Sequence, residues 1–227
     1  MQMKPMKNVK QLLSVGALGL LCFGTVVPAA ATPINLSTGF AAYTITADTN
    51  GEGLTPIDVS TPLPGGWIST LSNGVDSGVW IAPVAGQAAE PNTVSGSTTY
   101  QLTFSLSGLN PSTAVLAMNL AADDYVSVTL NGTSIFSPSS TQIANGMWTA
   151  STGTFDVTSG FNSGMNTLIF TVPNFSGDGT TSCCGPTGLD VAASVTANSA
   201  VPEPATFGLA GLALAGLGLL RLRKGTS

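Results

Sequence analysis

Apolar and polar residues alternate along the middle of the chain, between positions 32 and 199. The clearest runs with a period of two residues are 100–106, 116–120 and 126–130. A period of two places the apolar side chains on one face of a β-strand, so these runs predict half-buried strands. The same reasoning predicts further strands at residues 40–47, 66–71, 78–82, 133–136, 153–157, 166–172 and 189–196.

The connections between these runs are short and rich in Gly, Pro and Asn. Asn131-Gly132 separates the runs 126–130 and 133–136, and this dipeptide favours the type I′ turn of a tight hairpin. No segment of the middle region has a convincing helical period. Many short strands with such turns predict an all-β fold, a jelly-roll-type β-sandwich over residues 32–197.

The N-terminus has a different pattern, because three Lys in its first ten residues precede a long uncharged run. The apolar run covers residues 12–27, and the small residues Ala29 and Ala31 follow it. A basic start, an apolar middle and an A-x-A end predict a secretory signal peptide over 1–31, cleaved after Ala31. The alternative is an N-terminal membrane anchor, which the shortness of the run disfavours.

The C-terminus combines a linker at 198–204, an uncharged apolar stretch at 205–220 and a basic tail at 221–227. The apolar stretch is at the short end of the range for a transmembrane helix. The basic residues behind it predict that the tail stays in the cytoplasm. A plain single-pass anchor would also have this pattern. The basic residues of the tail are Arg221, Arg223 and Lys224.

The linker contains the triplet Pro202-Glu203-Pro204, and triplet, helix and basic tail in this order resemble the PEP-CTERM sorting signal of Gram-negative bacteria. The resemblance implies export, transient anchoring in the inner membrane, and cleavage near the triplet by an exosortase-type protease. It also implies release to the outer surface or the extracellular matrix, in association with exopolysaccharide or biofilm. The two prolines keep Glu203 on an extended segment that a protease can reach.

Three pieces of the body, residues 123–132, 164–170 and 185–191, resemble the jelly-roll domains of PEP-CTERM proteins. They resemble galactose-binding-like β-sandwiches more distantly. The resemblance implies that the strand before Asn131-Gly132 and the strand containing Asn166 belong to the framework of the fold. It implies little about a ligand, because such sandwiches serve many functions.

The charges are distributed very unevenly. The chain has 6 Lys and Arg, 11 Asp and Glu, and no His; every cation lies in the two terminal segments, and every acid except Glu203 lies in 32–199. A body without Lys or Arg cannot neutralise phosphates, which excludes nucleic acid as a partner. Without His, catalysis by Ser-His-Asp or Cys-His is excluded, and we expect no enzymatic activity.

One acidic loop has the beginning of a calcium-binding pattern. Asp48, Asn50 and Glu52 take its first, third and fifth positions and Gly53 the sixth, as in the first half of a calcium loop. The second half is missing, so an EF-hand is excluded. With Asp190 as a distant ligand, a single Ca²⁺ would relieve the repulsion among the acids. The alternative is a polar turn without a metal.

Trp148 and Tyr125 are the candidate ligand residues, because aromatic rings beside polar groups stack on sugars. Trp67 and Trp80 lie in strand-like patterns and are predicted to pack in the core instead. Asp123-Asp124 is predicted not to be a catalytic pair for glycoside hydrolysis. Neighbouring side chains on a regular strand point to opposite faces, unless the backbone bends there.

Cys183-Cys184 are the only cysteines that remain after removal of the signal peptide. Export favours their oxidation. A vicinal disulfide requires a strained ring, so free thiols and bonds between chains stay open as alternatives.

Together these features predict an exported, exosortase-processed structural or adhesive protein of the cell surface or extracellular matrix. Its predicted partners are the sorting protease, the inner membrane transiently, and polysaccharide. The alternative is a carbohydrate-binding module that uses loop aromatics and one Ca²⁺. A carboxylate-dependent enzyme acting on polysaccharides is the least favoured reading.

Overall fold

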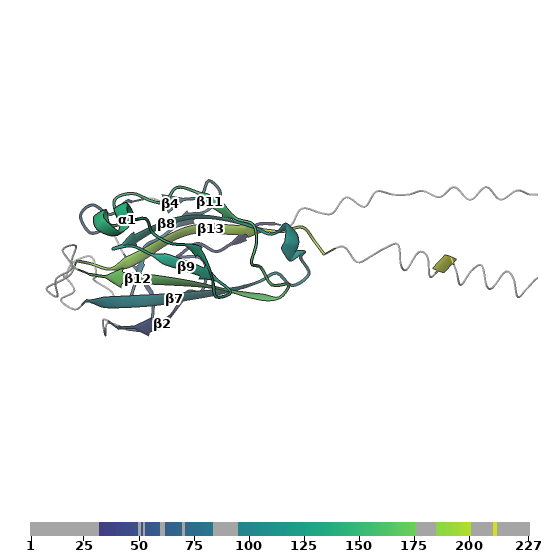
Figure 1. Ribbon diagram of the computed structural model, residues 1–227, viewed down its shortest axis with the longest axis horizontal. Coiled ribbons are helices and arrows are strands. Elements are labelled where there is room, and N and C mark those ends of the chain that lie inside the picture. The colour runs from purple at the N-terminus through teal and green to yellow at the C-terminus, as the bar shows by residue number, and fades with distance from the viewer. Residues whose placement is uncertain are drawn as a thin grey trace, which may run out of the picture.

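The computed structural model describes residues 32–49, 51, 53–59, 62–69, 71–83, 95–175, 185–200 and 211–212. Two antiparallel sheets pack face to face in a jelly-roll-type β-sandwich, as predicted (Figure 1). One sheet has the order β11 (Phe155–Val157), β8 (Val115–Asp123), β13 (Gly188–Thr196), β6 (Ile81–Ala82) and β3 (Ile57–Asp58), with β1 (Ile34–Asn35) also paired to β13. The other has the order β10 (Thr133–Phe136), β9 (Ser127–Leu130), β12 (Met165–Asn174), β7 (Gly96–Ser105) and β2 (Thr44–Asp48).

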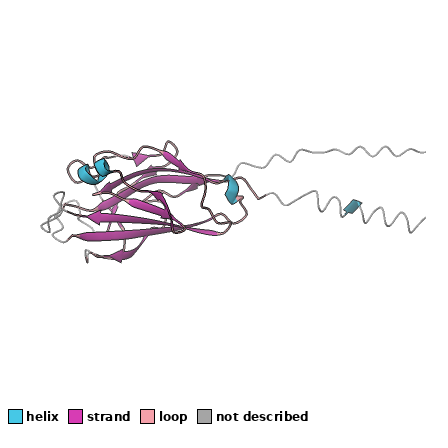
Figure 2. Ribbon diagram, in the orientation of Figure 1, coloured by secondary structure: helices cyan, strands magenta, loops and turns pink. Residues whose placement is uncertain are grey.

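The remaining elements are small. β4 (Leu71–Ser72) and β5 (Ser77–Gly78) form a separate hairpin. A 3₁₀ turn, η1 (Pro111–Thr113), and one short helix, α1 (Ser140–Asn145), interrupt the strands (Figure 2). The sequence pattern did not predict α1, because its six residues carry no apolar stripe. A capping box stabilises it instead, in which the side chains of Ser139 and Gln142 bond each other's backbone N–H groups.

The main core lies between the two sheets and follows the predicted alternation. Along β12 every second side chain from Asn166 to Asn174 is buried, and this strand pairs with β7 over its whole length. The facing sheet contributes the inward side chains of β8 and β13. Fully buried members of this core include Leu116, Met118, Leu120, Val128, Leu130, Leu168, Phe170, Leu189 and Val191.

A second apolar cluster covers the outer face of the six-stranded sheet. Trp67, Leu71 and Trp80 pack there on the outward side chains Ala121 of β8 and Ala192 of β13. The strand predicted at 66–71 is therefore wrong over 66–69, where the chain forms a turn and a bend. The turn places Trp67 over the sheet as a covering side chain rather than in a hydrogen-bonded ladder.

The hairpin predicted at Asn131-Gly132 is confirmed, since it joins β9 to β10 with φ of +51° and +81° at the two residues. The Asn131 side chain also donates to Asn166 Oδ1 at 2.9 Å and accepts from the backbone N–H of Thr167 at 2.9 Å. These bonds join the hairpin to β12. They agree with the framework role that the resemblance implied for the two strands.

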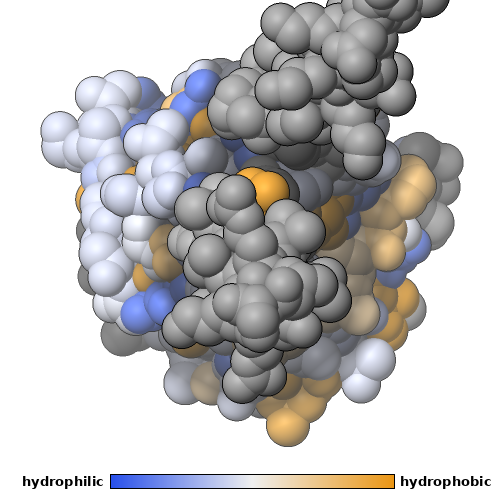
Figure 3. Space-filling view, turned by 90° about the vertical axis from the view of Figure 1, so that its right-hand side faces the viewer, coloured by the Kyte–Doolittle hydropathy of each residue, from blue (hydrophilic) through white to orange (hydrophobic). Residues whose placement is uncertain are grey.

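The first and last strands meet at one end of the sandwich. Ile34 of β1 pairs with Val195 of β13, and the Asn110 backbone N–H donates to Asn198 O at 2.8 Å at this same end. Figure 3 looks onto this end and shows pale, weakly polar residues on one side and orange, apolar residues on the other. The opposite end carries α1 and the C-terminal ends of β8 and β12 (Figure 1).

The predicted transmembrane helix at 205–220 is not shown by the structure, which describes only residues 211–212 of it. Within the described part of the chain, no helix has the length and apolar character needed to cross a bilayer.

Candidate functional site

Two adjacent carboxyl groups lie at the end of β8 opposite to the one beside which β1 pairs with β13. Asp123 is only 6% exposed, and its Oδ2 accepts a hydrogen bond from Trp67 Nε1 at 2.7 Å. Asp124 Oδ2 accepts from the backbone N–H of Phe175 at 2.6 Å. The peptide bond between the two aspartates is cis, and their carboxyl groups hydrogen-bond to each other. The chain bends at Asp124, directly after β8, so the exception stated for a bent backbone applies at this pair.

Both carboxyl groups hold their protons more tightly than usual. Burial raises the pKa of Asp123 to about 7; the Trp67 hydrogen bond opposes this shift and the neighbouring Asp124 adds to it. Burial also raises the pKa of Asp124, against the hydrogen bond from Phe175. Two carboxyl groups in contact retain a proton between them. A glycosidase separates its two carboxyl groups by about 5 to 9.5 Å, and this contact pair has a different geometry.

Trp67 and Trp80 are core residues, as predicted. Their rings stack with centroids 4.0 Å apart, and Trp80 Nε1 donates to Ile68 O at 2.9 Å. Gly188 on β13 makes room for them, since a Cβ there would lie 2.5 Å from a Trp67 ring atom. The stacked pair therefore holds the indole N–H that binds Asp123.

The two predicted ligand residues, Trp148 and Tyr125, lie on neighbouring segments at the same end. The Met147 backbone N–H donates to Asp124 O at 2.6 Å and so joins the two segments. Both side chains are half-buried: Trp148 packs against the cluster of Trp67 and Trp80, and Tyr125 packs against the main core. The structure thus joins the two segments through the backbone, while the two rings pack in different apolar clusters.

Asp190 is a second buried carboxyl group, on the central strand β13. It is 1% exposed, and Thr38 Oγ1 donates to its Oδ1 at 3.3 Å. Gly78 lies against this carboxyl, since a Cβ at Gly78 would overlap Asp190 Oδ1. Burial raises the pKa of Asp190 to about 7, and the Thr38 hydrogen bond opposes the shift.

The predicted calcium ligands are divided between the two sheets. Asp48 lies on β2 of the five-stranded sheet, where its Oδ2 accepts from the Gly53 backbone N–H at 2.8 Å. Asp190 lies on β13 of the other sheet, while Asn50 and Glu52 lie outside the described residues. Among the described residues, no group of three or more Cys, Asp or Glu side chains is arranged to hold a metal ion. The calcium loop stays a prediction.

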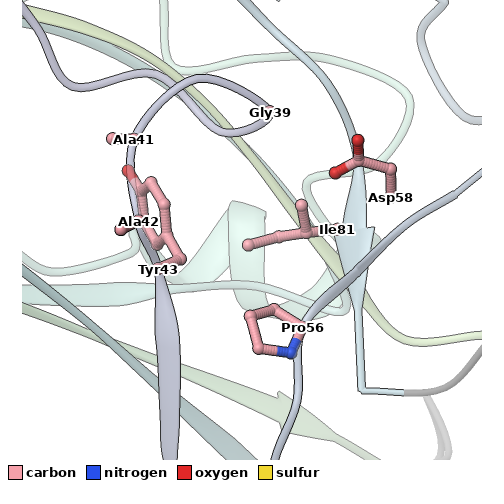
Figure 4. Close-up of a pocket in the computed structure, with 7 residues that line it drawn as sticks. All are labelled: Gly39, Ala41, Ala42, Tyr43, Pro56, Asp58 and Ile81. Carbon is pink, nitrogen blue, oxygen red and sulfur yellow. The ribbon is translucent and has the colours of Figure 1, made fainter.

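A pocket of about 160 Å³ opens between the segment that leads into β2 and the segment around β3, which are the edge strands of the two sheets. We call it the side pocket. Figure 4 shows the side chains of Tyr43, Ile81 and Pro56 around it, and the Asp58 carboxyl group is turned toward it. Its lining residues are Gly39, Ala41, Ala42, Tyr43, Pro56, Asp58 and Ile81.

The sequence interpretation did not find the side pocket. Its residues come from three separate segments, and small residues such as Gly39 and Ala42 carry no chemical signal on their own. The isolated acid Asp58 has no partner motif in the sequence. Only the pairing of β3 with β6 and the crossover from β2 bring these segments together.

The remaining predicted site residues lie outside the described residues. These are Ala29 and Ala31 of the signal peptide, Cys183 and Cys184, the triplet Pro202-Glu203-Pro204, and the basic residues Arg221, Arg223 and Lys224.

Comparison with known proteins identifies one segment and a similar fold. The PEP-CTERM protein-sorting motif matches residues 200–224, which confirms the predicted signal and indicates an exported protein. No characterised protein sequence matches the chain.

Among solved structures, the chain is similar to a family 35 carbohydrate-binding module from Clostridium thermocellum, with 14% identity and a TM-score of 0.34, covering 73% of this chain and 98% of that one. It is also similar to CBM35 from Paenibacillus barcinonensis, with 16% identity and a TM-score of 0.33, covering 74% and 100%. The likeness is to the β-sandwich fold alone.

Proposed function

We propose that the protein is a structural or adhesive component of the cell surface or extracellular matrix that associates with polysaccharide. The sorting motif at 200–224 carries this proposal, because it implies processing by an exosortase and delivery outside the inner membrane. The fold supports it by placing the last body residues at the same end as the first strand. While the tail anchors the chain, the opposite end of the sandwich is directed away from that attachment point.

The composition of the body also supports association with polysaccharide. Residues 32–199 contain no Lys or Arg, and the acids leave the body strongly negative. Such a body repels phosphates and other polyanions and accepts hydrogen bonds from hydroxyl groups. Neutral polysaccharides are rich in hydroxyl donors. Divalent cations such as Ca²⁺ can bridge the anionic body to acidic polymers, which a chelator would reveal.

The delivery step is tested by changing the triplet in the producing host. Glu203→Ala and Pro204→Ala are expected to keep the protein in the membrane fraction, since the protease loses its recognition segment. Cell fractionation followed by immunoblotting measures the released share. Asp156→Asn, an exposed change in the body, is the matched control and is expected to be released normally. Release of the triplet variants at the wild-type level would contradict processing at this site.

The association step is tested by co-sedimentation of the released protein with exopolysaccharide from the same host. We expect the protein to pellet with the polymer, and the same assay with a chelator separates direct binding from bridging by cations. Protein that stays in the supernatant under both conditions would contradict a matrix role through polysaccharide.

A further inference from the structure

We infer that the side pocket binds a single neutral sugar residue of a polysaccharide chain. This inference deepens the proposed function and rests on it for the source of the ligand. Four features of the described residues support it: a preformed wall, a mostly polar lining over a small apolar floor, one carboxylate acceptor and an exposed apolar rim.

The wall of the side pocket is held in place by buried hydrogen bonds behind it. Thr38 Oγ1 accepts from the backbone N–H groups of Val79 at 3.2 Å and Val191 at 3.1 Å. The Ala41 backbone N–H donates to Ser37 O at 3.0 Å and closes the turn that carries Gly39. These bonds fix the wall before a ligand arrives, and a preformed site binds with a smaller entropic cost.

The shape of the wall depends on Gly39. This residue has φ of +81°, and a Cβ there would lie 2.9 Å from Val79 Cγ2. Glycine alone adopts this conformation freely, and it keeps the turn close to Val79, in the segment between β5 and β6. The small side chains of Ala41 and Ala42 leave the remaining volume of the side pocket unfilled.

The floor and the single acid define the chemistry of the ligand. Ile81 and the ring of Tyr43 form the floor, where both are almost fully buried and expose only a small apolar edge, while the Tyr43 hydroxyl donates to Leu36 O at 2.8 Å. Asp58 supplies carboxylate oxygens at the mouth (Figure 4). Because most of the accessible lining is polar, a ligand that fits must bring mainly hydroxyl donors, and only a small C–H surface, to the side pocket. A sugar ring has both kinds of surface.

Charge excludes the acidic sugars. No Lys or Arg occurs in residues 32–199, so a uronate or a phosphate would meet Asp58 without a compensating cation. A metal ion is also disfavoured, because the described residues supply no cluster of three acids. A neutral, hydroxyl-rich ring is the class that remains.

Exposed apolar side chains continue the surface beyond the side pocket. Phe40, between the lining residues Gly39 and Ala41, is 69% exposed, and Ile57 and Val79 are each 38% exposed. Ile57 lies between the lining residues Pro56 and Asp58, and Val79 packs beside Gly39. Such a rim favours contact with the C–H faces of neighbouring sugar units along a chain.

Saturation-transfer NMR on the full chain, in a detergent that contains no sugar, tests the inference. The probes are D-glucose, D-galactose and D-mannose at millimolar concentration, and at least one is expected to give a saturable signal. Asp58→Asn is expected to weaken its binding about tenfold or more, because a hydrogen bond to a charged acceptor is lost. Ala42→Leu is expected to abolish it by filling the side pocket.

Two matched controls make the result specific. Asp156→Asn removes an exposed aspartate from β11, the edge strand on the other side of the same sheet. Ala47→Leu adds the same bulk to an exposed position of β2 outside the side pocket. Both are expected to bind like the wild type. Equal binding by Asp58→Asn and wild type, or equal loss in a control, would overturn the inference, as would Asp58-dependent binding of Ca²⁺ alone, measured by calorimetry.

The polymer assay separates this inference from the proposed function. If the wild type pellets with the exopolysaccharide and both pocket variants pellet equally well, the side pocket is not the binding site, while the proposed function stands. If the pocket variants bind neither the free sugar nor the polymer, both are supported. If the wild type binds the free sugars but not the polymer, the pocket inference stands and the proposed matrix role fails.

Discussion

The two sides of the sandwich, where edge strands of the two sheets lie, differ in the size of the side chains between the sheets. At one side, Phe136 of β10 and Phe155 of β11 stack across the gap with centroids 5.5 Å apart. At the other side, between β2 and β3, glycine and alanine line the side pocket. Two large rings close a gap that small residues leave open. The difference indicates that one side stabilises the fold and the other is available for a ligand.

The two sides also differ in the kind of contact that holds them together. Behind the side pocket, Asp190 and the Thr38 hydroxyl tie the wall to β13. The side closed by the phenylalanine stack is joined by apolar contact instead. We therefore expect the two sides to respond differently to pH and to substitution.

The largest expected effect is a loss of stability as the pH rises. Because the folded pKa of Asp123 and of Asp190 is raised to about 7, the folded protein binds more protons than the unfolded chain above about pH 4. The unfolding free energy should then fall between pH 4 and 7, by up to about 1.4 kcal/mol per pH unit for each carboxyl group, and level off above pH 7. Urea unfolding followed by tryptophan fluorescence at pH 4.5, 6 and 8 measures this change.

Asp190→Asn assigns part of this pH dependence to the pocket side. Asparagine imitates the protonated carboxyl group. The unfolding free energy of the variant should therefore change less with pH, by the contribution of one carboxyl group, and the variant should be more stable than the wild type at pH 8. Asp156→Asn, at the closed side, serves as the control and should keep the full slope. An unchanged slope in Asp190→Asn would show that this carboxyl does not retain its proton on folding.

The next effect is the loss of the aromatic closure. Phe155→Ala should lower the unfolding free energy by about 2 to 3 kcal/mol, because it removes a half-buried ring and the stacking contact of that ring with Phe136. Phe40→Ala, at the open side, should cost less than about 0.5 kcal/mol since its ring is mostly exposed. Both are measured by urea unfolding at one pH. Similar costs for the two variants would remove the distinction between the closed and the open side.

The smallest expected effect concerns the wall of the side pocket. Gly39→Ala and Gly74→Ala both place a side chain at positive φ, of +81° and +91°, but only the Cβ at Gly39 would meet another side chain, that of Val79. Each should cost about 1 kcal/mol for the backbone conformation. Gly39→Ala should cost about 1 kcal/mol more and also weaken sugar binding. Equal unfolding free energies in the two variants would mean that the Val79 side chain moves away from the new Cβ without a loss of stability.

Features that depend on neighbours in the chain were predictable. The period of two located most strands, and Asn131-Gly132 located the hairpin, because both signals act over a few residues. The sorting signal was recognised from the order of the triplet, the apolar stretch and the basic tail. The core positions of Trp67 and Trp80 also followed from the scarcity of other large side chains, although Trp67 reaches its place through a turn rather than a strand.

Features that depend on distant contacts were missed or misjudged. The contact between the carboxyl groups of Asp123 and Asp124 depends on how the chain leaves β8 and on Trp67, which is 56 residues away. The hydrogen bond between Asp190 and Thr38 and the contact of Asp190 with Gly78 were also not predicted, while the role of Asp190 as a distant ligand of the Asp48 loop stays a prediction. α1 forms through a capping box that has no apolar period.

The sequence by itself determined that the protein is exported and that its body is an anionic β-sandwich. These properties follow from composition, period and local order, which do not depend on how the strands are arranged in space. Only the tertiary structure decided which side of the sandwich is closed, which carboxyl groups are buried, and where a pocket opens. The order of strands in the sheets brings together segments that are far apart in the sequence. The burial that results raises the pKa of carboxyl groups such as Asp190, and no single segment encodes it.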